Sequence, residues 1–317
     1  MSEYGDRVRV RLPATSANLG SGFDTAAVAL DFYLTVEAEP AAEFSISATG
    51  RDAERCGALE DNLVIELYRT LVQREGRAVT PLAIRMENEI PLGMGCGSSA
   101  AGRLAAIVLA NHFGQLGWSS ERVLAEASEL EGHPDNAAAC WLGGFVASGT
   151  QGGEVHVARV EPPEEWRAIV VLPTEPLATS TARAVLPAIY ARTDVVINLQ
   201  GAAMLGLAFA QGRGDLLKAA MTDRVHQPYR AAICPQLPRL LPLAGQDGIL
   251  GVALSGAGPA VLAIVQSEKD VENASRRIDE AMREMQRPEL LVCGFEGNGT
   301  VIETGARAQR PAAAGYR

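Results

Sequence analysis

The sequence is poor in lysine and in net positive charge, and each shortage excludes a class of protein. Only Lys218 and Lys269 are lysines among the 28 basic residues, so arginine carries nearly all of the positive charge. Both lysines lie in polar, helix-like stretches, which leaves poor candidates for a buried catalytic lysine. Arginine suits bidentate recognition of carboxylate or phosphate. The net charge of -10 argues against a general nucleic-acid surface.

The sequence also lacks paired cysteines and long apolar runs. The five cysteines are scattered, odd in number and without a C-x-x-C pair, which favours reduced thiols over a disulfide framework or a zinc site. The first residues are polar and show no secretory pattern, and no apolar run approaches membrane-spanning length. We therefore expect a cytoplasmic protein with no membrane segment. The cysteines are Cys56, Cys96, Cys140, Cys234 and Cys293.

Strand and helix patterns alternate along the 317 residues, which predicts an α+β protein of two domains. We place the first domain at 1–160 and the second at 161–305, joined by an acidic, proline-bearing connection. We expect the tail, 306–317, to be disordered because it is rich in Arg, Ala, Pro and Gly. Residues 7–12 alternate as a half-buried strand that Pro13 should end.

A glycine-rich loop opens a helix in the middle of the first domain. Such a loop directs free backbone N–H groups and the positive end of a helix dipole at one point, which predicts a phosphate-sized anion site. The loop has no lysine, so it is not the loop of P-loop enzymes. The alternative is a turn that lets the helix pack closely, with the serines as helix caps. The residues are Pro91, Leu92, Gly93, Met94, Gly95, Cys96, Gly97, Ser98, Ser99, Ala100 and Ala101.

Further motifs occur at 13–24, 131–136 (E-G-H-P-D-N), 180–187, 226–230 and 254–262 (L-S-G-A-G-P-A-V-L). Together with the glycine loop, in this order, they resemble the GHMP kinases, and within that family most closely the homoserine kinase branch. The resemblance spans nearly the whole chain. It implies a GHMP two-domain fold, with an N-terminal domain like the second domain of ribosomal protein S5 and a ferredoxin-like C-terminal domain. It also implies ATP-dependent phosphorylation of L-homoserine in threonine biosynthesis, with Mg²⁺.

The resemblance implies that the glycine loop wraps the ATP phosphates and that Gly256 and Gly258 help to shape the nucleotide site. It assigns Ser99 and Glu131 to the metal, because a carboxylate there can hold Mg²⁺ against phosphate. Glu129 remains a rival for Glu131. Cys96 stands where the family commonly has leucine, and its modest, uncharged side chain should preserve the backbone path.

The remaining assignments concern the substrate. Arg183 and Arg230 resemble ligands of the homoserine carboxylate. The family often uses an aspartate to accept the substrate proton, and Asn136 stands at the equivalent place here. His133 is either a general base or a histidine that fixes its loop. The residues expected to bind substrate are Asn18, Asp24, His133, Asn136, Arg183 and Arg230, and those expected to act in catalysis are Asn136, Thr179 and Arg183.

Two alternatives stay open from the sequence. One is another GHMP kinase that acts on a mevalonate-type or shikimate-type alcohol. The other is a non-catalytic GHMP-fold regulator that binds a metabolite, since one fold hosts many functions. Asp24 favours an amino-acid substrate, because a plain hydroxy acid offers it no ammonium group. Ser21 stands where proline is common, and residues 25–27 replace a glycine-containing run. The oligomeric state is open, with a homodimer among the options.

Overall fold

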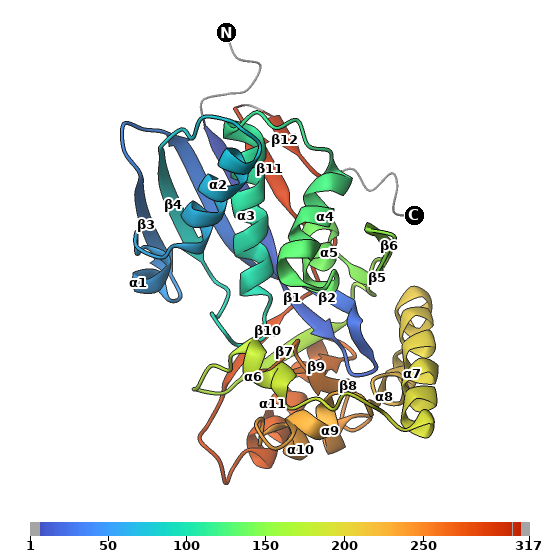
Figure 1. Cartoon of the computed structure of the whole chain (residues 1–317). Coiled ribbons are helices and arrows are strands. Elements are labelled where there is room, and N and C mark those ends of the chain that lie inside the picture. Colours follow the sequence, from blue (N-terminus) through green and yellow to red (C-terminus); the bar gives the residue numbers. More distant parts are fainter. Residues whose placement is uncertain (1–6, 306, 312–317) are drawn as a thin grey trace.

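The computed structural model describes residues 7–305 and 307–311, arranged around two sheets (Figure 1). The larger sheet has the strand order β12-β11-β1-β2-β4-β3, with β5 on β2 and β6 on β5. All of its pairs are antiparallel except β3 with β4. Its strands are β1 (Val8–Asn18), β2 (Gly22–Pro40), β3 (Ser45–Gly50), β4 (Leu82–Asn88), β5 (Phe145–Gln151), β6 (Glu154–Val160), β11 (Val301–Thr304) and β12 (Arg307–Gln309).

Helices cover one face of this sheet (Figure 1). Asn62 caps α2 by accepting from the N–H groups of Val64 and Ile65, and Ser119 caps α4 by accepting from Arg122. In both, a side-chain oxygen accepts from N–H groups two or three residues later, as an N-cap does. Helix α3 is apolar on most sides because it lies between its neighbours and the sheet. The helices are α1 (Ala53–Cys56), α2 (Leu63–Arg74), α3 (Ser98–Phe113), α4 (Ser120–Glu131) and α5 (Asp135–Leu142).

The second sheet is antiparallel, in the order β10-β7-β9-β8. Its central strands β7 and β9 carry continuous apolar runs, because nearly all of their residues are buried. The elements are β7 (Arg167–Leu172), α6 (Thr179–Ala184), α7 (Arg192–Gln211), η1 (Gly214–Leu216), α8 (Leu217–Ala220), α9 (Gln227–Arg230), α10 (Leu237–Leu240), η2 (Leu241–Leu243), β8 (Ile249–Leu254), β9 (Val261–Val265), η3 (Glu268–Asp270), α11 (Val271–Ala281) and β10 (Glu289–Cys293).

Three expectations differ from the structure. Pro13 does not end the first strand, because a register shift between Pro13 and Ala14 lets β1 continue to Asn18. The expected limit at 305 divides a hairpin, since β11 pairs with β1 of the larger sheet and with β12. Within the tail, 307–309 form β12, so disorder is wrong there, while residues 306 and 312–317 lie outside the described part of the chain.

Helix α7 corrects the expectation about apolar runs. Among the described residues it is the one helix long and apolar enough to cross a membrane by length and composition, with a mean hydropathy of 1.3. A single helix of this kind is weak evidence for a span, because packed helices of globular proteins meet the same criterion. Its buried side, which includes Leu205 and Phe209, belongs to the protein core.

Candidate functional site

The glycine loop joins β4 to α3 and needs glycine at its turns. Gly93, Gly95 and Gly97 have φ values of 71°, 83° and 73°, in the left-handed region that side chains rarely adopt. A Cβ on Gly95 would lie 2.3 Å from the carbonyl oxygen of Ser255, and one on Gly97 would lie 1.9 Å from Thr15 Oγ1. The loop therefore takes a path that no other residue could follow at these two positions.

Gly97 itself is the N-cap residue of α3, and no side chain caps this helix. The expectation that Ser98 and Ser99 cap it is therefore wrong, because both serines lie inside the first turn. The N–H groups at this helix start remain free of side-chain caps, as an anion site requires. Cys96 is fully buried, and burial raises the pKa of its thiol to about 12, so this thiol fills space as an uncharged group.

The turn between β8 and β9 holds the glycine loop from the other sheet. Ser255 Oγ donates to the carbonyl oxygen of Gly95 at 2.7 Å, and Ala260 N donates to that of Met94 at 3.1 Å. Asn18 Nδ2 donates to the carbonyl oxygen of Gly256 at 2.7 Å. Three segments that are distant in sequence therefore meet here.

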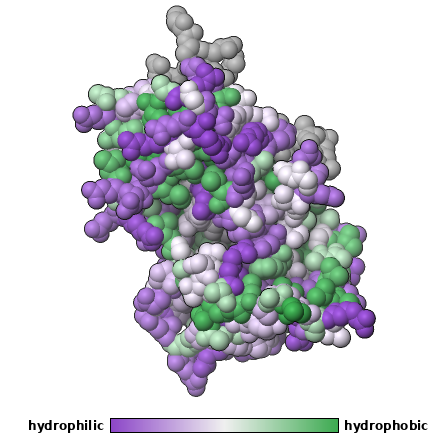
Figure 2. Space-filling model, viewed as in Figure 1, coloured by the Kyte–Doolittle hydropathy of each residue, from purple (hydrophilic) through white to green (hydrophobic). Residues whose placement is uncertain are grey.

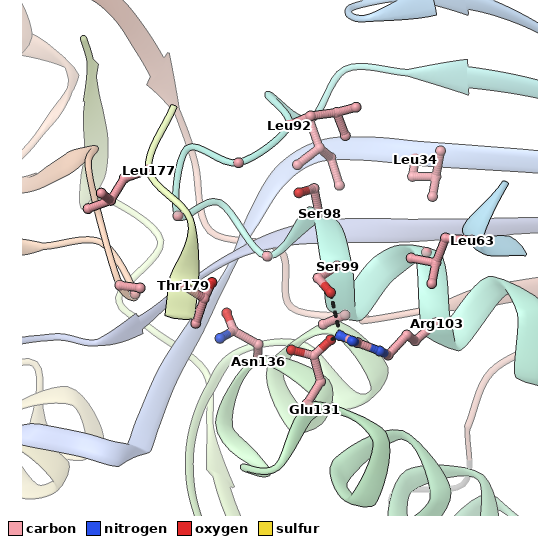
Figure 3. Close-up of a pocket in the computed structure, with 18 of the residues that line it drawn as sticks. Leu34, Leu63, Leu92, Ser98, Ser99, Arg103, Glu131, Asn136, Leu177 and Thr179 are labelled. Atoms are coloured by element: carbon pink, nitrogen blue, oxygen red, sulfur yellow. Dashed lines mark hydrogen bonds and ion pairs between the residues drawn. The ribbon is translucent and has the colours of Figure 1, made fainter. Parts of the chain in front are cut away.

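A cavity of about 500 Å³ lies beside this junction, between the two sheets. At one end its walls are apolar (Figure 3). Sequence reasoning missed this end, because the residues come from strands and helices that also serve the core. The only sequence signals were the alternation along β4 and the cap of α2. The apolar walls are Leu34, Leu63, Val64, Met86, Ile90 and Leu92.

The side chains of two asparagines at the apolar end form hydrogen bonds with nearby backbone groups. Asn62 donates to the carbonyls of Cys56 and Ala58 and accepts from α2. Asn88 donates to the carbonyls of Arg51 and Ile90 and accepts from Ile90 N. This end therefore offers mainly shape and apolar contact, which suits a flat ring.

Ser99 lies in the first turn of α3, and Glu131 is the last residue of α4. Both contact the guanidinium of Arg103, which lies one turn after Ser99 on α3 (Figure 3). The Glu131 side chain is only 9% exposed and lines the cavity. Glu129 is exposed and is not among the lining residues. The structure thus brings Glu131 to the loop and leaves Glu129 at the surface.

Asp24 forms a two-point ion pair with Arg183 of α6, with Arg183 Nη2 2.7 Å from Oδ1 and Nη1 3.1 Å from Oδ2. Asp24 holds φ at 52°, and its N–H donates to Asn18 Oδ1 at 2.9 Å. A carboxylate from β2 and a guanidinium from α6 therefore face the cavity together.

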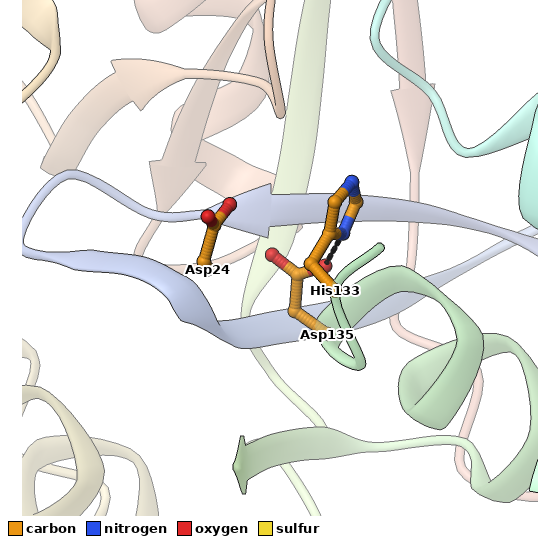
Figure 4. A group of neighbouring side chains, drawn as sticks. All are labelled: Asp24, His133 and Asp135. Atoms are coloured by element: carbon orange, nitrogen blue, oxygen red, sulfur yellow. Dashed lines mark hydrogen bonds and ion pairs between the residues drawn. The ribbon is translucent and has the colours of Figure 1, made fainter. Parts of the chain in front are cut away.

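His133 and Asp135 lie next to Asp24 (Figure 4), and one ligand-type atom of each residue falls within 4.8 Å of the others. His133 Nδ1 is 2.6 Å from Asp135 Oδ1. Burial opposes the charged imidazolium, but the hydrogen bond and charge of Asp135 raise the pKa of His133 above its usual value. The contact with Asp135 fixes the orientation of the His133 ring, which supports a role in holding its loop.

Arg230 lines the cavity, although only 1% of the residue is exposed. Its Nε donates to the carbonyl oxygen of Ala182 at 3.0 Å, and its Nη1 donates to His226 Nδ1 at 3.1 Å and to the carbonyl oxygen of Gly256 at 3.2 Å. Burial lowers the pKa of this guanidinium. Its Nη2 takes no part in these bonds, so that nitrogen is the one left for a ligand.

Asn136 and Thr179 approach each other across the cavity (Figure 3). Asn136 is the second residue of α5, and its Oδ1 accepts a hydrogen bond from Thr15 Oγ1 at 2.7 Å. The amide nitrogen makes one long contact, at 3.5 Å to Asp135 Oδ1, and keeps its second N–H for a ligand. Thr179 starts α6, the helix that also carries Arg183. All the predicted site residues of the substrate end therefore border one cavity.

Comparison with known proteins agrees with this architecture. The family models described as "GHMP kinases N terminal domain" and "GHMP kinases C terminal" match residues 62–144 and 207–284. A homoserine kinase of Solibacter usitatus is 43% identical over 301 residues, covering 94% of this chain and 98% of that protein. One of Deinococcus radiodurans is 42% identical and covers 83% of this chain and 85% of that protein.

Solved structures show the same fold. A homoserine kinase from Cytophaga hutchinsonii superposes with a TM-score of 0.81 at 24% identity, covering 96% of this chain and 99% of that one. A Leishmania mevalonate kinase bound to R-mevalonate has a TM-score of 0.71 at 14% identity, covering 93% and 99%. The chain belongs to the GHMP kinase family, within its homoserine kinases, and is an ATP-dependent kinase that acts on an alcohol group.

Proposed function

We propose that the protein transfers the γ-phosphoryl group of ATP to the side-chain hydroxyl of L-homoserine, giving O-phospho-L-homoserine for threonine biosynthesis. The observation that carries this proposal is the Asp24–Arg183 pair, which offers a carboxylate and a guanidinium side by side at the polar end of the cavity. A zwitterionic amino acid presents the complementary pair of charges. The homology to homoserine kinases adds to this argument.

In this proposal the nucleotide lies along the cavity, with the base between the apolar walls and the phosphates at the glycine loop. The glycine loop from Pro91 to Ala101 wraps the phosphates and binds them through free backbone N–H groups at the start of α3, while Gly256 and Gly258 shape the site beside it. The substrate carboxylate binds Arg183 and Nη2 of Arg230, and the ammonium group binds Asp24 and Asn18. His133 keeps the adjacent loop in place.

The reaction needs positioning more than covalent chemistry by the protein. The amide nitrogen of Asn136 and the hydroxyl of Thr179 hold the substrate oxygen toward the phosphate. This oxygen forms the new bond to phosphorus while the bond to ADP breaks, and its proton passes to a phosphate oxygen. Arg183 binds the carboxylate of the substrate and so keeps the substrate hydroxyl aligned with the phosphate.

Ser99 and Glu131 would hold Mg²⁺. The donor set fits this ion, because a hydroxyl and a carboxylate are hard oxygen ligands and the two already converge on one cationic group. The bound ion supplies charge neutralisation at the phosphates.

We also propose that the chain is a cytoplasmic homodimer. Helix α7 has a low share of buried residues for an apolar helix, and Figure 2 shows apolar side chains on the lower right of the molecule, where α7 lies in Figure 1. Val196, Leu199 and Leu207 are 44%, 64% and 57% exposed. A second copy would cover them, and Leu199→Glu should convert a dimer to a monomer in analytical ultracentrifugation.

The decisive assay couples ADP release to candidate alcohols: L-homoserine, mevalonate, shikimate and galactose. We expect kcat/KM for homoserine to exceed that for each other alcohol by at least about a hundredfold. Equal or better use of mevalonate or shikimate would favour a different GHMP kinase. Binding of homoserine without turnover of any alcohol would favour the non-catalytic regulator.

A further inference from the structure

Arg103 occupies the point where the two proposed metal ligands converge. Its Nη1 donates both to Ser99 Oγ and to Glu131 Oε1 (Figure 3). Arg103 comes from α3 and Glu131 from the last residue of α4, so the contact also joins two helices. The Arg103 side chain is 25% exposed and lines the cavity.

The charges at this point explain why a cation belongs there. Glu131 is largely buried and lies at the C-terminal end of α4, where the helix dipole disfavours a negative charge. Without a cationic partner, this carboxylate would be desolvated at a high cost. The guanidinium of Arg103 supplies the missing charge when neither metal nor nucleotide is bound.

We propose that Arg103 is an exchangeable cation of the phosphate site: it holds Ser99 and Glu131 in the empty enzyme and turns onto a phosphate oxygen when metal and nucleotide bind. The proposal rests on the metal role of Ser99 and Glu131 given above. The guanidinium occupies Ser99 Oγ and Glu131 Oε1 together, so a metal ion bound between these two atoms displaces it. Arginine is long and partly exposed here, and it carries donors that match phosphate.

Two opposite effects follow. In the nucleotide-free protein, Arg103 competes with the metal, so its removal should strengthen metal binding. In the nucleotide complex without metal, Arg103 contributes a positive charge, so its removal should weaken binding. A purely structural ion pair between α3 and α4 predicts neither effect.

The chain offers a matched control for the structural alternative. Arg74 of α2 pairs with Glu126 of α4 through two contacts of 2.8 Å, and Glu126 is 1% exposed. This pair also joins two helices through a buried carboxylate, but neither residue lines the cavity. Arg74→Leu should therefore lower stability and leave both affinities alone.

The experiment measures two affinities for Arg103→Leu, Arg103→Gln, Arg74→Leu and the unaltered chain. Mn²⁺ binding to nucleotide-free protein is followed by the electron paramagnetic resonance signal of free Mn²⁺. ATP binding in excess EDTA is followed by calorimetry. We expect both Arg103 variants to bind Mn²⁺ at least about fivefold more tightly and metal-free ATP about tenfold more weakly. Arg103→Gln keeps a polar side chain in case the leucine variant does not fold.

Metal-free ATP affinity within about twofold of the unaltered chain in both folded Arg103 variants would overturn the proposal, whatever their thermal stability. Weaker Mn²⁺ binding in these variants would overturn it as well. Neither measurement contains homoserine, so failure of the proposed substrate in the ADP-release assay would be seen separately.

Discussion

Asp24 of β2 and Arg183 of α6 are paired to each other across the cavity, at 2.7 Å and 3.1 Å, and each is a proposed ligand of the substrate. A substrate that engages both must break this pair. A zwitterion can do so without leaving a charge unpaired, because its carboxylate replaces Asp24 on Arg183 and its ammonium group replaces Arg183 on Asp24. A hydroxy acid has a carboxylate for Arg183 but no ammonium group, so it leaves the charge of Asp24 unpaired.

This exchange predicts strong discrimination against 4-hydroxybutanoate, which is homoserine without its amine. Breaking a desolvated charge pair costs about 2–5 kcal/mol, and partial exposure of both side chains places this site at the low end. We expect kcat/KM for the analogue to be lower by at least about thirtyfold. In Asp24→Asn the gap should close. Equal use of both compounds by the unaltered enzyme would contradict the ammonium argument.

Arg230→Ala should raise the KM for homoserine while leaving ATP affinity nearly unchanged. The structure adds a second effect, because Arg230 also ties Ala182 and Gly256 together from a buried position. We therefore expect a lower melting temperature as well. Arg183→Ala is the matched variant, since Arg183 is more exposed and should affect KM with a smaller loss of stability. A KM unchanged in both variants would remove the arginines from substrate binding.

Gly97→Val should abolish nucleotide binding, because its Cβ would collide with Thr15 Oγ1 and its φ of 73° is unfavourable for valine. Gly95→Val should do the same through the carbonyl oxygen of Ser255. Gly76→Val serves as the control, since its φ is similarly positive at 68° but nothing lies within 4 Å of its Cβ. ATP titration calorimetry on folded variants decides this, and unchanged affinity in Gly97→Val would refute the loop assignment.

Glu131→Gln should lower turnover far more than Glu129→Gln. Glu131 lies at the cavity beside Ser99, and Glu129 is exposed away from it. We expect a loss in kcat of at least about a hundredfold for the first variant and less than about twofold for the second. Activity measured against Mg²⁺ concentration should show a shifted metal requirement only for Glu131→Gln. A larger defect in Glu129→Gln would reverse the assignment.

His226 should make the fold sensitive to acid. The ring is fully buried, with Nε2 2.8 Å from the carbonyl oxygen of Gly20 and Nδ1 accepting from Arg230, which requires a neutral imidazole. Burial lowers the pKa of His226 below its usual 6.5. The unfolded chain therefore binds a proton that the folded chain does not, and stability falls as the pH drops below about 6.5.

The loss from this one group is at most about 1.4 kcal/mol for each pH unit until the folded-state pKa is reached. Urea unfolding between pH 5 and 7.5 measures it. His226→Gln should be less stable at pH 7.5 but should lose less stability on acidification. An unchanged slope in that variant would contradict the neutral, buried state of His226.

Local features of the fold were predictable because their causes are local. Asn62 and Ser119 cap their helices through backbone groups two or three residues away, and Gly143 follows the last residue of α5. Strand β12 was not predictable, since its partner β11 decides its structure and its own composition resembles a tail. Pro13 was misjudged because a bulge set by pairing with β2 carries the strand past it.

The candidate site divides in the same way. The glycine loop was found from its own residues, and the structure explains its glycines through contacts with Thr15 and Ser255. The Asp24–Arg183 pair and the role of Arg103 depend on side chains 159 and 28 positions apart in sequence. Such contacts arise from tertiary packing, which a pattern in a single sequence does not contain.

The position of β11 has a consequence for how the chain folds. Strand β1 pairs with β2 on one side and with β11 on the other, so the larger sheet stays incomplete until residues 301–309 have been synthesised. A fragment ending at 160 would leave the edge of β1 open to pairing with other chains. The second sheet is thus encoded as an insertion within the larger sheet. Pairing of β11 with β1 joins residues far apart in sequence, and we expect it late in folding.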